Sequence, residues 1–109
     1  MRVLAACVGL LLAACSGAAP DGPSVRVGSK KFTESVILGD MVTQLARSAG
    51  VRAEHRRELG GTQVLWQALR RGEIDLYPEY TGTLRQEIFA GRALPDDESL
   101  RQALAAEGL

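Results

Sequence analysis

Two tyrosines and a set of lysine, hydroxyl and amide side chains are the residues of this sequence best suited to bind a small charged molecule. Both tyrosines of the chain lie in the stretch DLYPEYTGT, residues 75–83. An aromatic face attracts a cation through the ring quadrupole, by about 0.5–2 kcal/mol per contact. This suits a quaternary ammonium, which has no N–H to donate. A lysine and a hydroxyl could hold a carboxylate at the other end of such a ligand. The candidates for these roles are Lys30, Lys31, Thr62, Gln63, Thr81 and Thr83.

Residues for catalysis are poorly represented, so the sequence predicts a binding protein and not an enzyme. His55 is the only histidine, and its charged surroundings favour a solvated strand face over a catalytic base. We find no serine beside a plausible base in the sequence and no cluster with metal-ligand spacing. Asp96 and Asp97 follow Pro95 and are expected to cap a helix. No cofactor and no metal are therefore expected.

The order of predicted elements is typical of an α/β fold with a mostly parallel sheet. The expected strands are residues 25–27, 51–59 and 74–77, although the composition of residues 51–59 would also permit a helix. The expected helices are residues 34–49, 62–71, 83–90 and 95–105. Ligands of such sheets bind beyond the carboxyl ends of the strands. Three segments follow those ends: residues 28–32, 60–63 and 77–83.

The apolar pattern of the first helix predicts which of its faces is buried. Ile37, Met41 and Leu45 recur at four-residue spacing, and Leu38, Val42 and Ala49 widen the stripe. In the second helix Trp66 lies at helical spacing, so packing is its expected role. Packing is also the expected role of Tyr77, which precedes Pro78.

The first 24 residues predict an export signal and a tether. A basic start is followed by a short apolar run and by LAAC, with small residues before Cys15. This pattern resembles the lipobox of bacterial lipoproteins, in which the cysteine becomes the lipid-carrying N-terminus. The prediction is a signal peptide over residues 1–14, with a plain signal peptide as the alternative. Lipidated Cys15 and a flexible tether then span residues 15–24, and the folded part spans 25–109.

Composition supports a small extracytoplasmic domain that binds no nucleic acid. The chain has 109 residues and a formal net charge of +0. Its two cysteines, Cys7 and Cys15, both lie in the expected signal and lipobox, so no disulfide can form in the mature domain. Membrane attachment would come from the lipid and not from a spanning helix.

Three blocks together identify a family resemblance: VRVGSKKFTESVILGDMVTQLARSAG, LGGTQVLWQALRRGEIDLYPEYTGT and the lipobox. They resemble the substrate-binding proteins of ABC importers for osmoprotectants, which take up glycine betaine, choline, carnitine or related quaternary amines. The resemblance implies a periplasmic-binding-protein fold of type II, of which residues 25–109 are a partial first lobe. It also implies an ABC permease as partner and a location in the periplasm or at the cell surface.

The resemblance assigns roles residue by residue. Tyr80 matches a tyrosine of the aromatic cage around the ammonium, and Lys30 matches a lysine that grips the ligand carboxylate. Thr83 matches a hydroxyl that assists there, and Gln63 falls near a position that tunes ligand choice. Lys30 thus favours a carboxylated ligand such as glycine betaine over choline. Simpler roles remain open: a solvated lysine at a strand end for Lys30, a turn aromatic for Tyr80, and a cap or local salt bridge for Glu79.

The chain departs from the family pattern in one respect, because the second lobe and its further tyrosines are not in this sequence. We therefore expect a half-cage that binds weakly, and we expect sheet edge and apolar helix faces to be exposed. Residues 1–109 would then be the N-terminal part of an importer component. The alternative is a truncated surface lipoprotein, acting as an interaction or regulatory module that needs a second chain.

Overall fold

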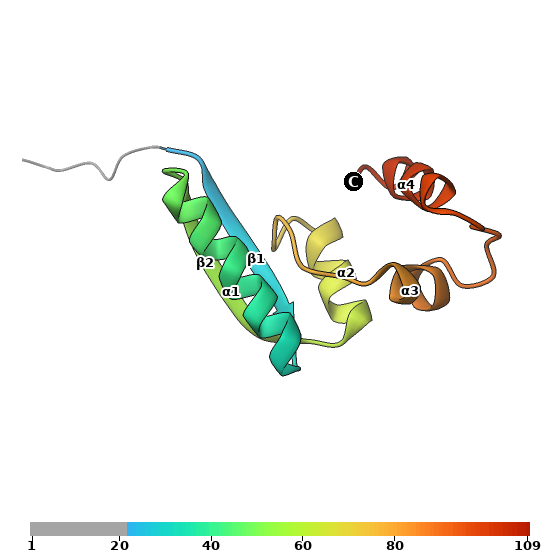
Figure 1. Cartoon of the computed structure of the whole chain (residues 1–109), viewed down its shortest axis with the longest axis horizontal. Coiled ribbons are helices and arrows are strands. Elements are labelled where there is room, and N and C mark those ends of the chain that lie inside the picture. The colour runs from blue at the N-terminus through green and yellow to red at the C-terminus, as the bar shows by residue number, and fades with distance from the viewer. Residues whose placement is uncertain (1–21) are drawn as a thin grey trace, which may run out of the picture.

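The computed structural model describes residues 22–109. The predicted signal peptide, Cys15 and most of the tether lie outside the described residues. The elements follow one another along the chain as shown in Figure 1. In order they are β1 (Ser24–Lys30), α1 (Thr33–Ser48), β2 (Arg52–Gly60), α2 (Thr62–Arg70), the single turn α3 (Thr81–Thr83), a π-helical turn (Leu84–Ile88) and α4 (Asp97–Ala106).

The sheet of the described residues consists of β1 and β2, which pair in parallel. The register runs from Ser24 opposite Arg52 to Lys30 opposite Gly60, with an irregularity near the carboxyl ends. Glu58 has a φ of 54° in this irregular stretch. The mixed α/β class predicted from the sequence is confirmed, including the strand at residues 51–59.

The prediction of a third strand at residues 74–77 is wrong. Only one ladder pair forms there, between Val27 and Leu76, and it is parallel. Backbone bonds still tie this segment to β1, because the Gly28 N–H donates to the Leu76 carbonyl (2.9 Å). Pro78 follows two residues later and has no N–H to donate, so a longer ladder cannot form at that position.

Neighbouring residues of β1 show that α1 and α2 cover opposite faces of the sheet. The Cβ position of Gly28 points toward α2, since a Cβ built there would lie 2.9 Å from a methyl of Leu65. Ser29 bonds instead to His55, whose ring lies against Gly39 of α1. Successive strand residues point to opposite faces, which accounts for this division.

The buried face of α1 is the opposite of the predicted one. Ile37, Met41 and Leu45 are 53, 54 and 65% exposed. The residues that α1 buries are small: Ser35, Gly39 and Thr43. Small side chains let the helix lie close to the strands, and this leaves Ile37, Met41 and Leu45 on the outer surface, whereas Leu38 and Val42 of the predicted stripe are half-buried. The exposure of an apolar helix face, expected from the sequence, is confirmed.

On the α2 side the core follows ordinary hydrophobic packing. Leu65 and Ala68 of α2 pack with Ile74, and half-buried Tyr77 packs against them. Trp66 belongs to a second cluster and meets the edge of the Phe89 ring, with 5.9 Å between centroids. The predicted packing roles of Trp66 and Tyr77 are confirmed.

In the last third of the chain, the predicted cap of one helix is confirmed and the prediction of another helix is wrong. In place of one helix over residues 83–90, the chain forms the turn α3 at residues 81–83 and the π-helical turn at residues 84–88. Asp96 caps α4 as predicted, by accepting the Ser99 N–H at 2.8 Å in a capping box. This bond lowers the pKa of Asp96.

Candidate functional site

Three chain segments meet in a hollow of about 470 Å³ at the carboxyl ends of β1 and β2. We call this hollow the candidate pocket. It is lined by residues 30–32, residues 60–62, and Tyr80, Thr83 and Glu87. These are the three segments that the sequence placed at the strand ends, so the predicted location of the site agrees with the geometry.

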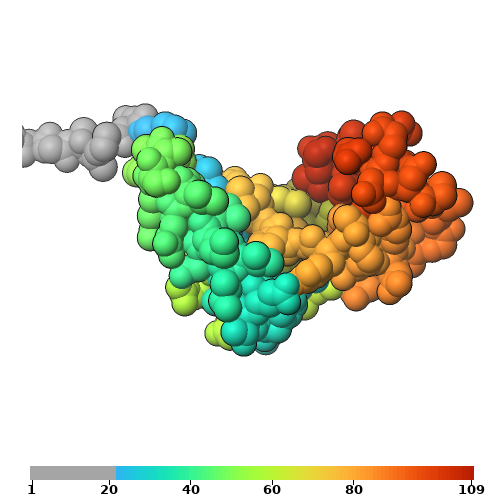
Figure 2. Space-filling model, viewed as in Figure 1, coloured from blue at the N-terminus to red at the C-terminus, as the bar shows by residue number. Residues whose placement is uncertain are grey.

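Parallel pairing is what brings these segments together. Lys30 ends β1 and lies opposite Gly60, which ends β2. A backbone bond from the Lys31 N–H to the Gly60 carbonyl (3.2 Å) continues the contact past the strands. The third segment reaches the candidate pocket because Asp75 and Leu76 run alongside β1, bonded to Arg26 and Gly28, and the chain then continues toward α3. In Figure 2 the teal start of α1 touches the orange segment around residue 80.

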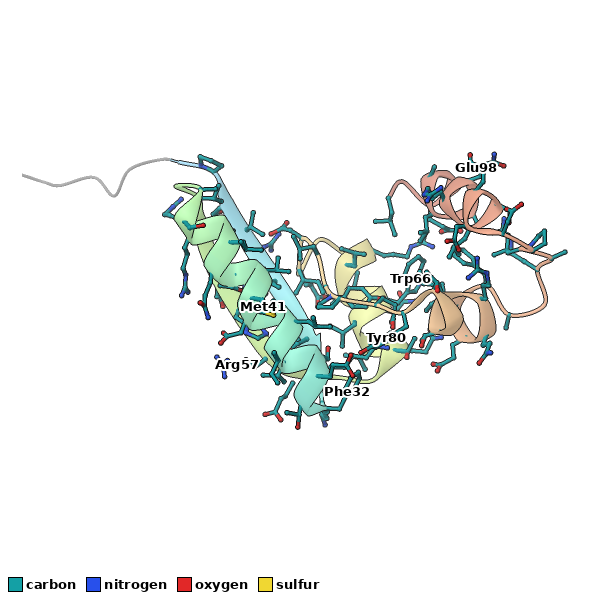
Figure 3. The ribbon with its side chains drawn as sticks, viewed as in Figure 1. Phe32, Met41, Arg57, Trp66, Tyr80 and Glu98 are labelled. Atoms are coloured by element: carbon teal, nitrogen blue, oxygen red, sulfur yellow. The ribbon has the colours of Figure 1, made fainter. Side chains whose placement is uncertain are left out.

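Phe32 and Tyr80 form the aromatic wall of the candidate pocket. Their rings stack with 6.5 Å between centroids and 26° between planes. Figure 3 shows the two side chains close together, although positions 32 and 80 are 48 residues apart in the sequence. Both remain about two-fifths exposed, at 42 and 40%, so a ligand can reach them. Sequence reasoning assigned no ligand contact to Phe32; its position two residues after the end of β1 is the signal that could have found it.

The position of Tyr80 is fixed by neighbouring carboxylates. The Tyr80 N–H donates to Glu79 Oε1 at 3.0 Å. Glu34, in the first turn of α1, lies beside the Tyr80 hydroxyl, and a hydrogen bond between them raises the pKa of Tyr80. The phenol is therefore neutral at neutral pH, and its ring face keeps the negative quadrupole that attracts cations.

Lys30 is buried, which excludes the simple reading of a solvated lysine at a strand end. Its Nζ lies 2.6 Å from Glu79 Oε1 and 3.1 Å from Thr62 Oγ1. The side chains of Lys30 and Glu79 are each 7% exposed. The salt bridge of Glu79, one of the roles left open by the sequence, is confirmed, but it joins positions 49 residues apart and is not local.

The remaining sequence candidates do not all line the candidate pocket. Thr83 lines the candidate pocket with Tyr80 and Lys30. Gln63 does not line it and borders a different hollow with Gln67 and Arg71. Its neighbour Thr62 takes the position beside Lys30.

Tyr77 does not line the candidate pocket and borders another hollow with Glu79 and Trp66. Burial raises the pKa of Tyr77, and the nearby Glu79 carboxylate raises it further. Among the described residues the Tyr77 hydroxyl and Glu79 Oε2 lack a hydrogen-bond partner. Glu79 is thus a buried carboxylate that uses one oxygen for Lys30 and the Tyr80 backbone.

His55 is not solvated, and the expectation that no serine lies beside a base is also wrong. The His55 side chain is 5% exposed, with Nε2 at 2.9 Å from Ser29 Oγ and Nδ1 at 3.3 Å from Asp40 Oδ1. The His55 bond, followed by the charge of Arg57, lowers the pKa of Asp40. Ser29 is 0% exposed, so no substrate reaches its hydroxyl in this arrangement. The three side chains instead join β1, β2 and α1.

The described residues contain neither a cluster of metal-ligating side chains nor a membrane-spanning helix. Within residues 22–109 no group of three or more His, Cys, Asp or Glu side chains could hold a metal ion. In the same residues no helix has the length and apolar character needed to cross a membrane.

Comparison with known proteins relates the sequence of this chain to a family. Residues 23–108 match the family model described as the substrate binding domain of ABC-type glycine betaine transport system. The chain is similar to the glycine betaine-binding protein YehZ of Escherichia coli K12, with 42% identity over 73 residues. It is also similar to the carnitine transport binding protein OpuCC of Listeria monocytogenes, with 33% identity over 102 residues.

These alignments cover much more of this chain than of the relatives. The match to YehZ includes 67% of this chain and 24% of YehZ. The match to OpuCC includes 89% of this chain and 32% of OpuCC. The chain thus spans about a quarter to a third of the length of the curated relatives that it matches.

Proposed function

The chain belongs to the family of substrate-binding domains of ABC-type glycine betaine transport systems, and from this premise we propose that it captures a quaternary ammonium osmoprotectant outside the cytoplasm. The ligand would be glycine betaine or a related amine. The bound ligand would then pass to an ABC permease. The chain itself would do no chemistry on it.

The observation that supports this proposal is the aromatic wall beside Lys30 and Thr83. The exposed faces of Phe32 and Tyr80 suit the methyl groups and the diffuse charge of a quaternary ammonium. Thr83 and one N–H of Lys30 suit the carboxylate of a betaine. Gln63 would act on ligand choice only indirectly, since it lies outside the candidate pocket.

The family and the lipobox resemblance also support a membrane-attached protein. Lipidation of Cys15, which lies outside the described residues, would anchor the domain by its N-terminus. The residues up to the start of β1 at Ser24 would then form the tether between the lipid and the lobe. Such a tether would let the candidate pocket face solvent near a permease.

The test is an NMR titration of the full chain with glycine betaine and choline at millimolar concentrations, which detects weak binding. We expect Tyr80→Leu to weaken binding about 2- to 30-fold, because it removes a cation–π contact. Tyr80→Phe retains the ring face and is the matched control. The uncharged tert-butyl analogue of choline should bind less tightly than choline. Equal affinity for Tyr80→Leu and the unsubstituted protein would refute the cage assignment.

A further inference from the structure

The charge of Lys30 is already matched inside the protein. Its Nζ lies 2.6 Å from Glu79 Oε1, and both side chains are nine-tenths buried. Lys30 lines the candidate pocket, whereas Glu79 does not and borders a separate hollow with Tyr77 and Trp66. A ligand carboxylate that approaches Lys30 therefore approaches a neutral pair and not an isolated cation.

The hydrogen-bonding capacity of Lys30 is also mostly used. An ammonium has three N–H donors. One donates to Glu79 and one to the Thr62 hydroxyl at 3.1 Å, which leaves one for a ligand. Separating Lys30 from Glu79 would leave a buried carboxylate without a partner, which is strongly unfavourable. We therefore expect Lys30 to remain bonded to Glu79 when a ligand is present.

Glu79 opposes a carboxylated ligand by its own charge. A ligand oxygen bonded to the same Nζ would lie within a few ångströms of Glu79 Oε1, and like charges at such a separation repel. The ammonium end of the ligand is unaffected, because it rests on the exposed rings of Phe32 and Tyr80.

We propose that Glu79 is a specificity-determining residue: it holds Lys30 in a neutral pair and so keeps the contribution of a ligand carboxylate small. This inference rests on the proposed function. It names the substrate class as quaternary amines with or without a carboxylate, so choline is accepted nearly as well as glycine betaine. It also revises the sequence-based expectation that Lys30 favours betaine.

Glu79→Gln is the variant that isolates this role. The amide oxygen of glutamine still accepts from Lys30 and from the Tyr80 N–H, which Glu79 Oε1 now accepts at 3.0 Å. The position of Tyr80 is thereby kept while the negative charge is removed. Glu98→Gln is the matched control, since it removes one carboxylate charge from the exposed surface of α4.

The experiment is an NMR titration of the full chain and its variants with glycine betaine and with choline. In the unsubstituted protein we expect the Kd for choline to exceed that for betaine by less than about threefold, the effect of one ordinary hydrogen bond. In Glu79→Gln this ratio should rise about tenfold, because the charge of Lys30 is then no longer offset by a neighbouring carboxylate and its bond to the ligand is strengthened. Glu98→Gln should leave the ratio unchanged.

An unchanged ratio in Glu79→Gln, or an equal rise in Glu98→Gln, would overturn the inference while leaving the proposed function intact. Absence of binding of both amines to every variant would refute the proposed function, and the inference with it. A double-mutant cycle of Lys30→Met and Glu79→Gln, followed by urea unfolding, tests the ion pair without any ligand. Additive losses in that cycle would show that the pair is not formed, and would overturn the inference even where ligands bind.

Discussion

Helices α1 and α2, which cover β1 and β2, both carry an apolar stripe in the sequence but differ in which residues they bury. Helix α2 buries Leu65 and Trp66 against the segment that follows it. Helix α1 buries Gly39 and other small residues, and leaves its largest apolar side chains outside. One face of the sheet is thus covered by a hydrophobic core, and the other by a helix held through close contact and polar bonds. An apolar stripe in a helix therefore does not by itself identify the face that is buried within this lobe.

The largest test of this difference compares two leucine deletions. Leu65→Ala on α2 should lower the free energy of unfolding by about 2–5 kcal/mol, since its side chain is 0% exposed and leaves a cavity. Leu45→Ala on α1 should change it by less than about 0.5 kcal/mol, because that side chain is 65% exposed. Urea unfolding measures both. Similar losses of unfolding free energy would mean that Leu45 is buried in solution to the same extent as Leu65.

The close approach of α1 to the sheet is tested at Gly39. A Cβ at this position would meet His55 Nε2 at 2.5 Å, and Ser29 and Asp40 hold that ring in place. Gly39→Val should therefore cost about 1–3 kcal/mol of unfolding free energy through overpacking. The control is Gly82→Val in α3, where a Cβ meets nothing within 4 Å.

Relief of the same clash sharpens the test. Gly39→Val combined with His55→Ala should lose less stability than the sum of the two single losses, because the ring that blocks the valine is gone. Strict additivity in thermal unfolding would show that the valine is accommodated in some other way.

A smaller effect concerns the polar link that fastens the segment after α2 to β1. Asp75 bonds the Arg26 side chain at 2.9 and 3.0 Å and the Arg26 N–H at 2.7 Å, and these contacts lower the pKa of Asp75. A lowered folded-state pKa stabilises the fold above the unfolded-state value of about 3.9, and the gain is lost as pH falls through the folded-state value. Asp75→Asn should thus be less stable than the unsubstituted chain near neutrality, with the difference shrinking below about pH 4. Chemical unfolding across pH measures this; a constant difference would contradict it.

The smallest expected effect is on the outer surface of α1. Replacing Ile37, Met41 and Leu45 together by glutamine should change the free energy of unfolding by less than about 1 kcal/mol, because all three are exposed by half or more. Light scattering should show less self-association at high concentration, since an apolar patch is removed. A loss of several kcal/mol would instead mean that this surface is covered in solution.

Much of the site could be predicted from local sequence, because its segments are marked by local signals. Strand ends at Lys30 and Gly60, and a turn with Tyr80 and Thr83, are set by short-range patterns. Parallel order then places such ends at one edge of a sheet. The pairing partners could not be predicted in the same way. The Phe32–Tyr80 stack and the Lys30–Glu79 pair join positions nearly fifty residues apart, and they depend on how α3 is directed toward β1.

The sequence by itself determined the order of β1, α1, β2 and α2, the cap at Asp96, the packing role of Trp66 and the family to which the chain belongs. These follow from local propensity, periodicity and motif spacing, which act over a few residues. Only the tertiary structure decided that α1 turns Ile37, Met41 and Leu45 outward, that His55 is buried beside Ser29, and that Lys30 is paired with Glu79. Each of these depends on which surface lies opposite, and the period of a helix or a strand contains no information on the element that covers it.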